Sequence, residues 1–498
     1  MSGVDLVEAT VDDLQEAYES GEATCREVVN QYLDRIEAYD RNGPELNGII
    51  RVNPRARERA DELDQELDAS GEFIGPLHGI PVLVKDQAET ADIETTFGSI
   101  AFEEYQPTED ARIVRNLRDA GAIVLAKTNM PDWASTWFGF SSVLGRTKNP
   151  YALDRDPGGS SSGTAAGITA NLGTIGIGED TGGSIRLPAS FTNLFGIRVT
   201  TGLISRTGFS PLVKFQDTPG PLTRTVKETA QLLDVLVGYD PDDEFTAVTE
   251  LTQVDDSFTN YLKEDGLDGI RLGVLRDAFG PDDDSRSAPV NDRVADAIDE
   301  MANQGAELID PVTIPELDRF MDDSMLYILL SKYELNQFIG SRSNSPVDSI
   351  EEIYTSGQYH ERLELFQDIV RDGPDDPESV LEYWEALVEQ ERFQRTLLNV
   401  FAENDLDAIV CPNVQTLPPT AEALRAGEWS PPMNPLIASQ TRCPAMSVPA
   451  GLTDDGLPVG VELIGKPYDE PTLIEMAYAY EQAADPRVDP ETAPELSE

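Results

Sequence analysis

Histidine is nearly absent from this chain of 498 residues, which contains only His78 and His360. A Ser-His-Asp triad would need one of them as its base, and neither lies near a nucleophile elbow in the sequence. There is no HExxH pattern and no cluster of cysteine and histidine, so no metal site is predicted. P-loop and GxGxxG patterns are lacking as well, and we therefore expect no nucleotide and no other cofactor.

Cysteines and long apolar runs are also scarce. Cys25, Cys411 and Cys443 are odd in number and far apart, which favours a reducing, cytoplasmic location over a disulfide framework. No run of about eighteen apolar residues occurs, so we expect no transmembrane helix. The acidic N-terminal stretch lacks the basic and apolar regions of a signal peptide.

Positive charge is heavily outweighed, since 37 lysines and arginines face 92 aspartates and glutamates, for a net charge of −55. Such a surface repels nucleic-acid phosphates and anionic lipids, so we expect no direct nucleic-acid partner and no membrane partner. The acidic residues are spread along the whole chain, which favours a surface adapted to high salt over an acidic binding protein.

The apolar pattern alternates between helical and strand-like segments, as is typical of an α/β fold. Residues 8–70 are predicted to be largely helical, and the helical, acidic stretch 290–405 is interpreted as an insertion. Strands are predicted within 79–86, 113–130, 174–178, 269–277, 408–413 and 445–451, and further helices within 113–130, 164–172, 226–238 and 472–484. The Pro- and acid-rich residues 485–498 are predicted to be disordered.

Two loops rich in glycine and serine are the strongest chemical signal. The first is PGGSSSG at 157–163, and the second is DTGGSIR at 180–186. In the second loop, Thr181, Gly182 and Gly183 could direct main-chain N–H groups at an oxyanion that develops beside Ser184. One such loop alone is usually a linker or a turn, but apolar segments of the predicted core flank both.

A serine nucleophile needs a base, and with histidine unavailable a lysine is the next candidate. Lys85 ends the apolar run IPVLV, where burial would lower its pKa and favour the neutral amine. Its position alone leaves two alternatives open, a side chain that reaches solvent and an ion pair with Asp86. Lys127 also ends a predicted strand and is equally ambiguous.

Three segments resemble the amidase signature family: GIPVLVKD (79–86), PGGSSSGTAA (157–166) and GEDTGGSIRLPA (178–189). The resemblance extends from about residue 8 to 483. It implies a single α/β domain over 1–484, in which helices cover both faces of a mixed sheet. Its parts would be a helical N-terminal segment (8–70), a catalytic core (71–280), the insertion (290–405) and the rest of the core (406–484).

The resemblance also implies the catalytic roles. Ser184 aligns with the nucleophile, Lys85 with the base, and Ser160, after a cis Gly159–Ser160 peptide, with the bridging serine. Thr181, Gly182 and Gly183 align with the oxyanion-hole amides. The reaction would be hydrolysis of a small or peptide-like carboxamide to the acid and ammonia or an amine, through an acyl-enzyme and without a cofactor.

One departure from the family pattern bears on the substrate. Ser162 stands where glycine is usual, and together with NPYALDRDPGG (149–159) this favours the subgroup that contains peptide amidases. The alternative is the glutaminase subunit of a tRNA-dependent amidotransferase. A non-catalytic binding homologue is disfavoured because all three triad residues are present. Whether the chain forms a homodimer is left open.

Overall fold

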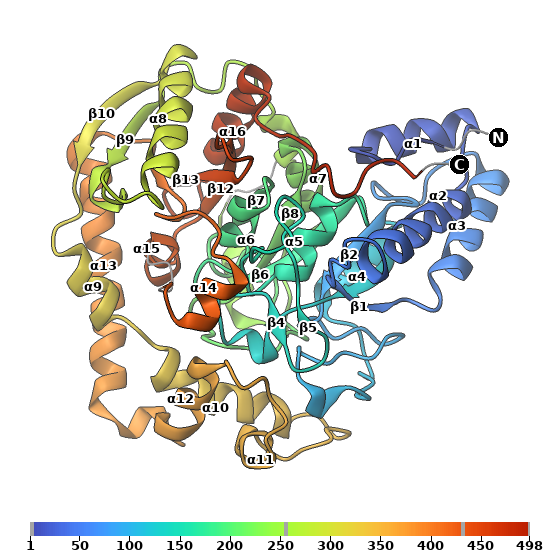
Figure 1. Cartoon of the computed structure of the whole chain (residues 1–498), viewed down its shortest axis with the longest axis horizontal. Coiled ribbons are helices and arrows are strands. Elements are labelled where there is room, and N and C mark those ends of the chain that lie inside the picture. Colours follow the sequence, from blue (N-terminus) through green and yellow to red (C-terminus); the bar gives the residue numbers. More distant parts are fainter. Residues whose placement is uncertain (1–3, 253–256, 430–433, 497–498) are drawn as a thin grey trace.

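A mixed β-sheet runs through the molecule (Figure 1). The structure is a computed structural model that describes residues 4–252, 257–429 and 434–496. The strands of the sheet in these ranges are β1 (Ile49–Val52), β2 (Pro81–Lys85), β3 (Ile123–Thr128), β6 (Ile175–Asp180), β7 (Phe195–Arg198), β8 (Thr218–Thr223), β9 (Arg271–Leu275), β10 (Glu307–Val312), β11 (Ala408–Pro412), β12 (Ala445–Leu452) and β13 (Pro458–Ile464). A separate hairpin joins β4 (Phe140–Ser141) and β5 (Gly145–Arg146).

The strand order is β1-β3-β2-β6-β8-β7-β12-β13-β11-β9-β10. Parallel pairs lie in two places, β3-β2-β6 and β11-β9-β10, and the strands between them are antiparallel. The α/β class and the mixed sheet predicted from the sequence are therefore confirmed. Strands β1, β7, β8, β10 and β13 were not predicted as elements.

Helices cover both faces of the sheet. On one face, α4 (Arg112–Asp119), α7 (Val226–Leu236), α16 (Glu470–Ala484) and α8 (Ala288–Asn303) contact one another in a row. On the other face lie the short helices α5 (Ser162–Thr169) and α6 (Arg186–Phe191). Helix α5 approaches β6 so closely that a Cβ at Gly176 would lie 2.5 Å from Thr164 Cγ2. Small residues in these elements therefore let the catalytic loops sit directly on the sheet.

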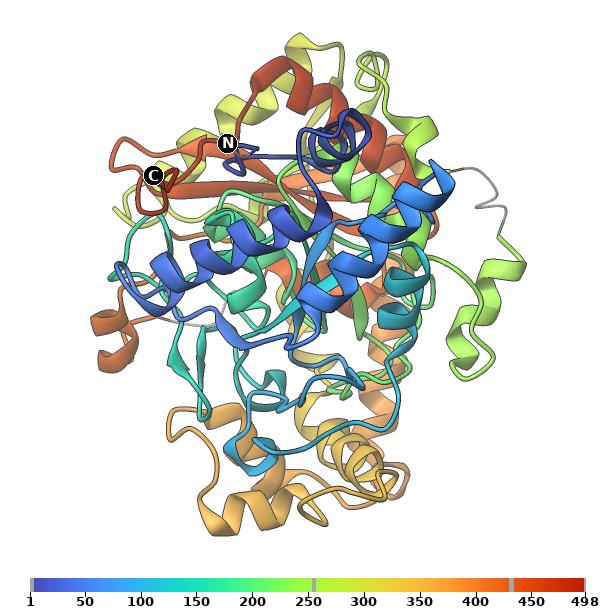
Figure 2. The same cartoon turned by 90° about the vertical axis from the view of Figure 1, so that its right-hand side faces the viewer.

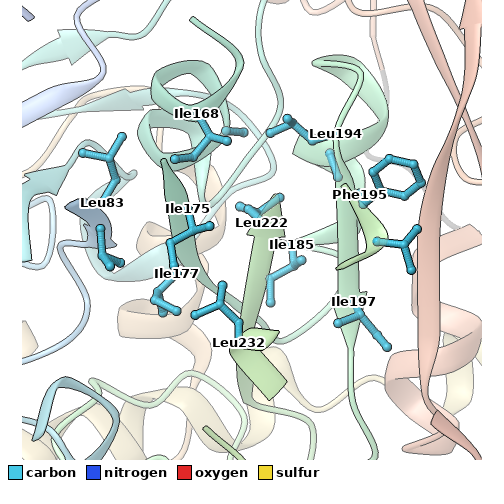
Figure 3. Packing of buried hydrophobic residues seen from close by; sticks show 14 of the residues in the cluster. Leu83, Ile168, Ile175, Ile177, Ile185, Leu194, Phe195, Ile197, Leu222 and Leu232 are labelled. Carbon is cyan, nitrogen blue, oxygen red and sulfur yellow. The ribbon is translucent and has the colours of Figure 1, made fainter. Parts of the chain in front are cut away.

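The main core lies between these layers (Figure 3). Side chains of β6 and β8 pack with those of α5 on one side and α7 on the other. Those labelled in the figure are Leu83, Ile168, Ile175, Ile177, Ile185, Leu194, Phe195, Ile197, Leu222 and Leu232, all of them fully buried. The strands that carry the candidate site thus rest on a dry, close-packed base.

The N-terminal helices α1 (Val11–Ser20), α2 (Cys25–Arg35) and α3 (Ala56–Ser70) lie at the β1 end of the sheet, in blue in Figures 1 and 2. A second helical group consists of α9 (Leu317–Asp323), α10 (Tyr327–Gly340), α11 (Ile350–Ser356), α12 (Glu364–Asp372) and α13 (Leu381–Asn404). It runs from the left side of Figure 1, where α9 and α13 are labelled, to its lower end, where α10, α11 and α12 are labelled. Two further helices, α14 (Ala421–Ala426) and α15 (Asn434–Thr441), follow β11.

Two sequence-based boundaries need correction. The helical insertion was predicted over 290–405, but most of α8 and all of β10 belong to the layers of the sheet, so the helical cap begins at α9. Apolar periodicity shows which side of a helix is buried, but not whether that side packs on the sheet or on other helices, and this is why the boundary was misplaced.

The tail 485–498 was predicted to be disordered, but its described part, up to residue 496, packs against the N-terminal helices. Arg35 donates hydrogen bonds to the carbonyl oxygens of Ala493 and Pro494, at 2.8 and 3.0 Å. Arg487 forms an ion pair with Glu8. Composition predicted a solvated segment because these partners lie more than 450 residues away in the sequence. Residues 497–498 lie outside the described residues.

No helix in the described ranges has the length and apolar character needed to cross a membrane.

Candidate active site

Lys85 is the last residue of β2, and its side chain is completely buried. Its Nζ lies 2.8 Å from Ser160 Oγ, 3.1 Å from the main-chain oxygen of Glu179 and 3.4 Å from Glu179 Oε2. Burial lowers the pKa of Lys85, and the nearby Glu179 carboxyl offsets this only in part. The lysine thus contacts the serine that the sequence analysis assigned to it.

Ser160 lies in the loop before α5 and follows a cis Gly159–Ser160 peptide. Next to it, Ser161 connects the two glycine-serine loops. Its N–H donates to the main-chain oxygen of Ser184 at 3.2 Å, and its hydroxyl is 3.3 Å from both the N and the O of Glu179. The first loop is therefore fastened to β6 and to the nucleophile loop.

Ser184 lies between β6 and α6 and is 5% exposed. In the described part of the chain, no hydrogen bond joins its hydroxyl to Ser160. The two loops are thus neighbours, but the Ser184–Ser160 step of the predicted relay has no direct hydrogen bond here.

The second loop is held by a buried ion-pair network around Asp180. Asp180 accepts hydrogen bonds from the N–H groups of Gly183 (2.8 Å) and Ile185 (3.2 Å), and its carboxylate is 3.1 Å from both Arg186 Nε and Arg198 Nη1. Burial raises the pKa of Asp180, but the two arginines and the hydrogen bonds outweigh it and hold the pKa well below its usual range. Asp180 and Arg186 therefore fix the loop and leave the substrate to other groups.

The three main-chain N–H groups predicted to bind the oxyanion differ in whether they already have a hydrogen-bond acceptor. The N–H of Gly183 is already taken by Asp180. Within the described residues, no protein acceptor binds the N–H of Thr181 or Gly182. Gly183 has a φ of 106°, a conformation that favours glycine, and a Cβ there would lie 2.4 Å from Pro435.

Two carboxyl groups at the site were missed by the sequence analysis. Glu179 faces Lys85, and Asp217 accepts a hydrogen bond from Thr181 Oγ1 at 2.6 Å. Burial raises the pKa of Glu179 to about 7. The signal for Glu179 was present, because an acid that ends an apolar strand, directly before the DTGGS loop, has to be buried close to the loop.

Two aromatic residues at the oxyanion loop were missed as well. Trp137 Nε1 donates to the main-chain oxygen of Gly182 at 2.8 Å. The Tyr327 ring packs edge-on against Trp137, and a Cβ at Gly182 would lie 2.0 Å from the Tyr327 hydroxyl. Tyr327 begins α10, so the helical cap contacts the site, which nothing in the sequence pattern indicates.

The remaining candidates are structural. Lys127 pairs with Asp86 at 3.0 Å, which leaves Lys85 for Ser160. His78 stacks on Phe73 and His360 lies beside Phe140. In the described ranges, no group of three or more histidine, cysteine, aspartate or glutamate side chains is placed to hold a metal ion.

Most of the chain, residues 27–474, matches the model of a protein family described as amidase. The chain belongs to the amidase family. Among its relatives is a glutamyl-tRNA(Gln) amidotransferase subunit of Thermoanaerobacter pseudethanolicus. This amidase is 32% identical to it over 503 residues, which cover 96% of this chain and 97% of the relative.

Solved structures agree with this assignment. The peptide amidase of Stenotrophomonas maltophilia superposes on this amidase with a TM-score of 0.87 and 34% identity, over 98% of this chain and 99% of that one. An amidase family protein of Bacillus anthracis gives a TM-score of 0.85 and 31% identity, over 98% and 93%. The predicted family and fold class are therefore confirmed, and the chain is an amide-hydrolysing enzyme.

Proposed function

We propose that this amidase hydrolyses a peptide-like carboxamide through an acyl-enzyme on Ser184, with Ser160 as proton relay and Lys85 as base. The observation that carries the proposal is the 2.8 Å contact between Lys85 Nζ and Ser160 Oγ in a fully buried site. A buried amine next to a hydroxyl can act as a base where a solvated lysine would be protonated.

The steps of the reaction conserve protons. Neutral Lys85 takes a proton from Ser160, which takes one from Ser184 as the Ser184 oxygen attacks the amide carbon. The oxyanion would be bound by the N–H groups of Thr181 and Gly182, with Gly183 as the third amide once it is freed from Asp180. The relay then runs in reverse to protonate the leaving ammonia or amine, and water cleaves the ester by the same route.

The peptide-like substrate class has two supports. One is the similarity to the Stenotrophomonas maltophilia peptide amidase over nearly the full length of both chains. The other is the aromatic pair of Trp137 and Tyr327, which contacts the oxyanion loop and would favour an acyl group with apolar side chains.

The second candidate function is that of a glutaminase subunit in a tRNA-dependent amidotransferase. It is favoured by the 32% identity to the amidotransferase chain of Thermoanaerobacter pseudethanolicus. Such a protein would copurify with a second chain and release little ammonia alone.

One assay separates the two functions. Ammonia release is measured from C-terminally amidated peptides, simple aliphatic and aromatic amides, and glutamine. We expect the amidated peptides to be the best substrates. A clear preference for glutamine, realised only with a partner chain, would favour the second function. Ser184→Ala should abolish turnover and leave the folded circular-dichroism spectrum unchanged, and turnover near the wild-type rate would remove Ser184 from the mechanism.

We further propose that the enzyme works in a salt-rich cytoplasm. The net charge of −55 supports this, because concentrated salt is needed to screen the self-repulsion of such a surface. Dilution into low salt should unfold the protein, as followed by circular dichroism. A melting temperature that does not change with salt concentration would contradict this proposal.

A further inference from the structure

The carboxyl group of Glu179 is a buried titratable group that the hydrolytic steps above leave without a role. It is 1% exposed. Its Oε2 lies 3.4 Å from Lys85 Nζ, and its main-chain oxygen lies 3.1 Å from the same atom. Its Oε1 lies 3.2 Å from Thr181 Oγ1. Glu179 therefore connects the catalytic amine to the oxyanion loop.

The Thr181 hydroxyl has one proton and two carboxyl oxygens within reach. Asp217 Oδ1 is 2.6 Å away, and Glu179 Oε1 is 3.2 Å away. Asp217 also accepts the main-chain N–H groups of Leu212 and Val213, at 2.8 and 3.0 Å, so it is bonded as a carboxylate. The shorter bond takes the Thr181 proton. The contact with Glu179 is then a hydrogen bond only if Glu179 Oε1 carries a proton of its own.

The hydrogen-bond donors and acceptors around the Lys85 amine match a neutral amine better than an ammonium group. A neutral amine has two N–H donors and one lone pair, whereas an ammonium group has three donors and no acceptor. Two neighbours of Nζ accept, namely the main-chain oxygen and Oε2 of Glu179. The third, Ser160 Oγ at 2.8 Å, can donate. A neutral amine satisfies all three contacts and directs its lone pair at the hydroxyl that it has to deprotonate.

We propose that Glu179 is the proton store of this active site: its carboxyl group holds the proton that an ion-paired Lys85 would carry, and thereby keeps Lys85 a neutral base. One proton moves from the ammonium to the carboxylate, which leaves an amine and a carboxylic acid, and the net charge of the pair stays zero. The inference rests on the proposed acyl-transfer function and adds Glu179 to it as a positioning residue.

The electrostatics agree with this assignment. Burial, together with the charges of Asp217 and Asp180, raises the pKa of Glu179 to about 7 in spite of the opposing charge of Lys85. Burial lowers the pKa of Lys85. Glu179 also borders a cavity of about 390 Å³, through which its proton can exchange with solvent. The other charged groups that line this cavity are Arg206, Lys214, Asp217, Asp242, Asp243, Glu334 and Arg342.

Glu179→Gln tests the proposal, because an amide reproduces the donor to Thr181 and the acceptor from Lys85 without a titrating proton. The measurement is the pH profile of kcat/KM for an amidated peptide. We expect the acid limb to stay within about half a pH unit and the rate within about threefold, since Lys85 faces an uncharged neighbour in both proteins. A downward shift of the limb by more than about one pH unit would overturn the proposal, because it would show that a charged Glu179 had been holding Lys85 as an ammonium group.

Glu179→Ala provides the contrast. It removes the partner of both Lys85 and Thr181, so kcat should fall by about tenfold to a hundredfold through misplacement of the base, with KM little changed. Recovery of kcat in Glu179→Gln supports the proton store. Equal impairment of the two variants would contradict it.

Infrared spectroscopy detects the protonation state of the Glu179 carboxyl group without turnover. The difference spectrum between the wild type and Glu179→Gln should contain the C=O band of an un-ionised carboxylic acid at neutral pH, and a carboxylate band in its place would refute the proposal. Glu228→Gln is the matched control, since Glu228 is also buried and its capping box with Thr225 on α7 accepts glutamine. It should leave the activity unchanged. Because this measurement needs no substrate, its result is independent of the Ser184→Ala test of the proposed function.

Discussion

Two fully buried lysines lie at the ends of adjacent parallel strands, Lys85 as the last residue of β2 and Lys127 as the last but one of β3. Burial lowers the pKa of both. Their partners differ. Lys127 Nζ donates hydrogen bonds to Ala88 O (2.7 Å) and Thr95 Oγ1 (2.9 Å), and Asp86 Oδ1 lies 3.0 Å away as its ion-pair partner, surroundings that suit an ammonium ion.

Lys85 has two acceptors and one hydroxyl that can donate, which match a neutral amine. Burial alone therefore does not make a lysine a base. What distinguishes the two sites is whether the groups around the amine all accept hydrogen bonds from it or whether one of them can donate.

The largest effect should come from Lys85→Met. It removes the base and leaves no buried charge unpaired if Glu179 is already protonated, so ammonia release should fall by about 10²–10⁴-fold while the melting temperature stays close to that of the wild type. A loss of less than about tenfold would point to another base.

Lys127→Met should reverse this pattern. It leaves Asp86 as a buried carboxylate without its ion-pair partner, so the free energy of unfolding should fall by about 3–5 kcal/mol, as measured by urea denaturation. The activity per folded molecule should change little. The comparison between the two lysines would break down if this variant folded normally and were inactive.

The double variant Lys127→Met/Asp86→Asn is the control for Lys127→Met. Removal of the uncompensated charge should restore part of the lost stability. If no stability returned, the ion pair would not be the cause of the loss.

The smallest effect is expected from Thr95→Val, which removes one acceptor from Lys127 and keeps the shape of the side chain. The free energy of unfolding should fall by about 1.5–3 kcal/mol, the usual contribution of a hydrogen bond to a charged group. The pH profile of ammonia release should be unaffected, because Thr95 does not contact Lys85. A shifted acid limb would show that the two lysine sites are coupled.

The sequence was enough to predict the α/β class, the buried strand that ends at Lys85 and the two loops that carry Ser160 and Ser184. These features are local, since apolar runs and glycine-serine loops are contiguous in the chain. The family resemblance supplied the roles of the three residues and the cis peptide before Ser160, which the structure also has.

What the sequence could not predict depends on contacts between distant segments. The choice between Lys85 and Lys127 stayed open because both end apolar strands, and their partners come from loops that the pattern does not pair. Tyr327 reaches the oxyanion loop from the helical cap, more than 140 residues further along the chain. Glu179 was visible as a residue, but its role depends on the side chains that face it.

The bonds from Arg35 to the carbonyl oxygens of Ala493 and Pro494 have a consequence for the order of assembly on the ribosome. The guanidinium of α2 is synthesised early, yet two of its acceptors emerge some 458 residues later. Until then, Arg35 in the N-terminal helices lacks two of its final hydrogen-bond acceptors. The N-terminal helices should therefore reach their final packing last. Truncation before residue 493 should increase hydrogen exchange in these helices first, while the amides of β6 stay protected.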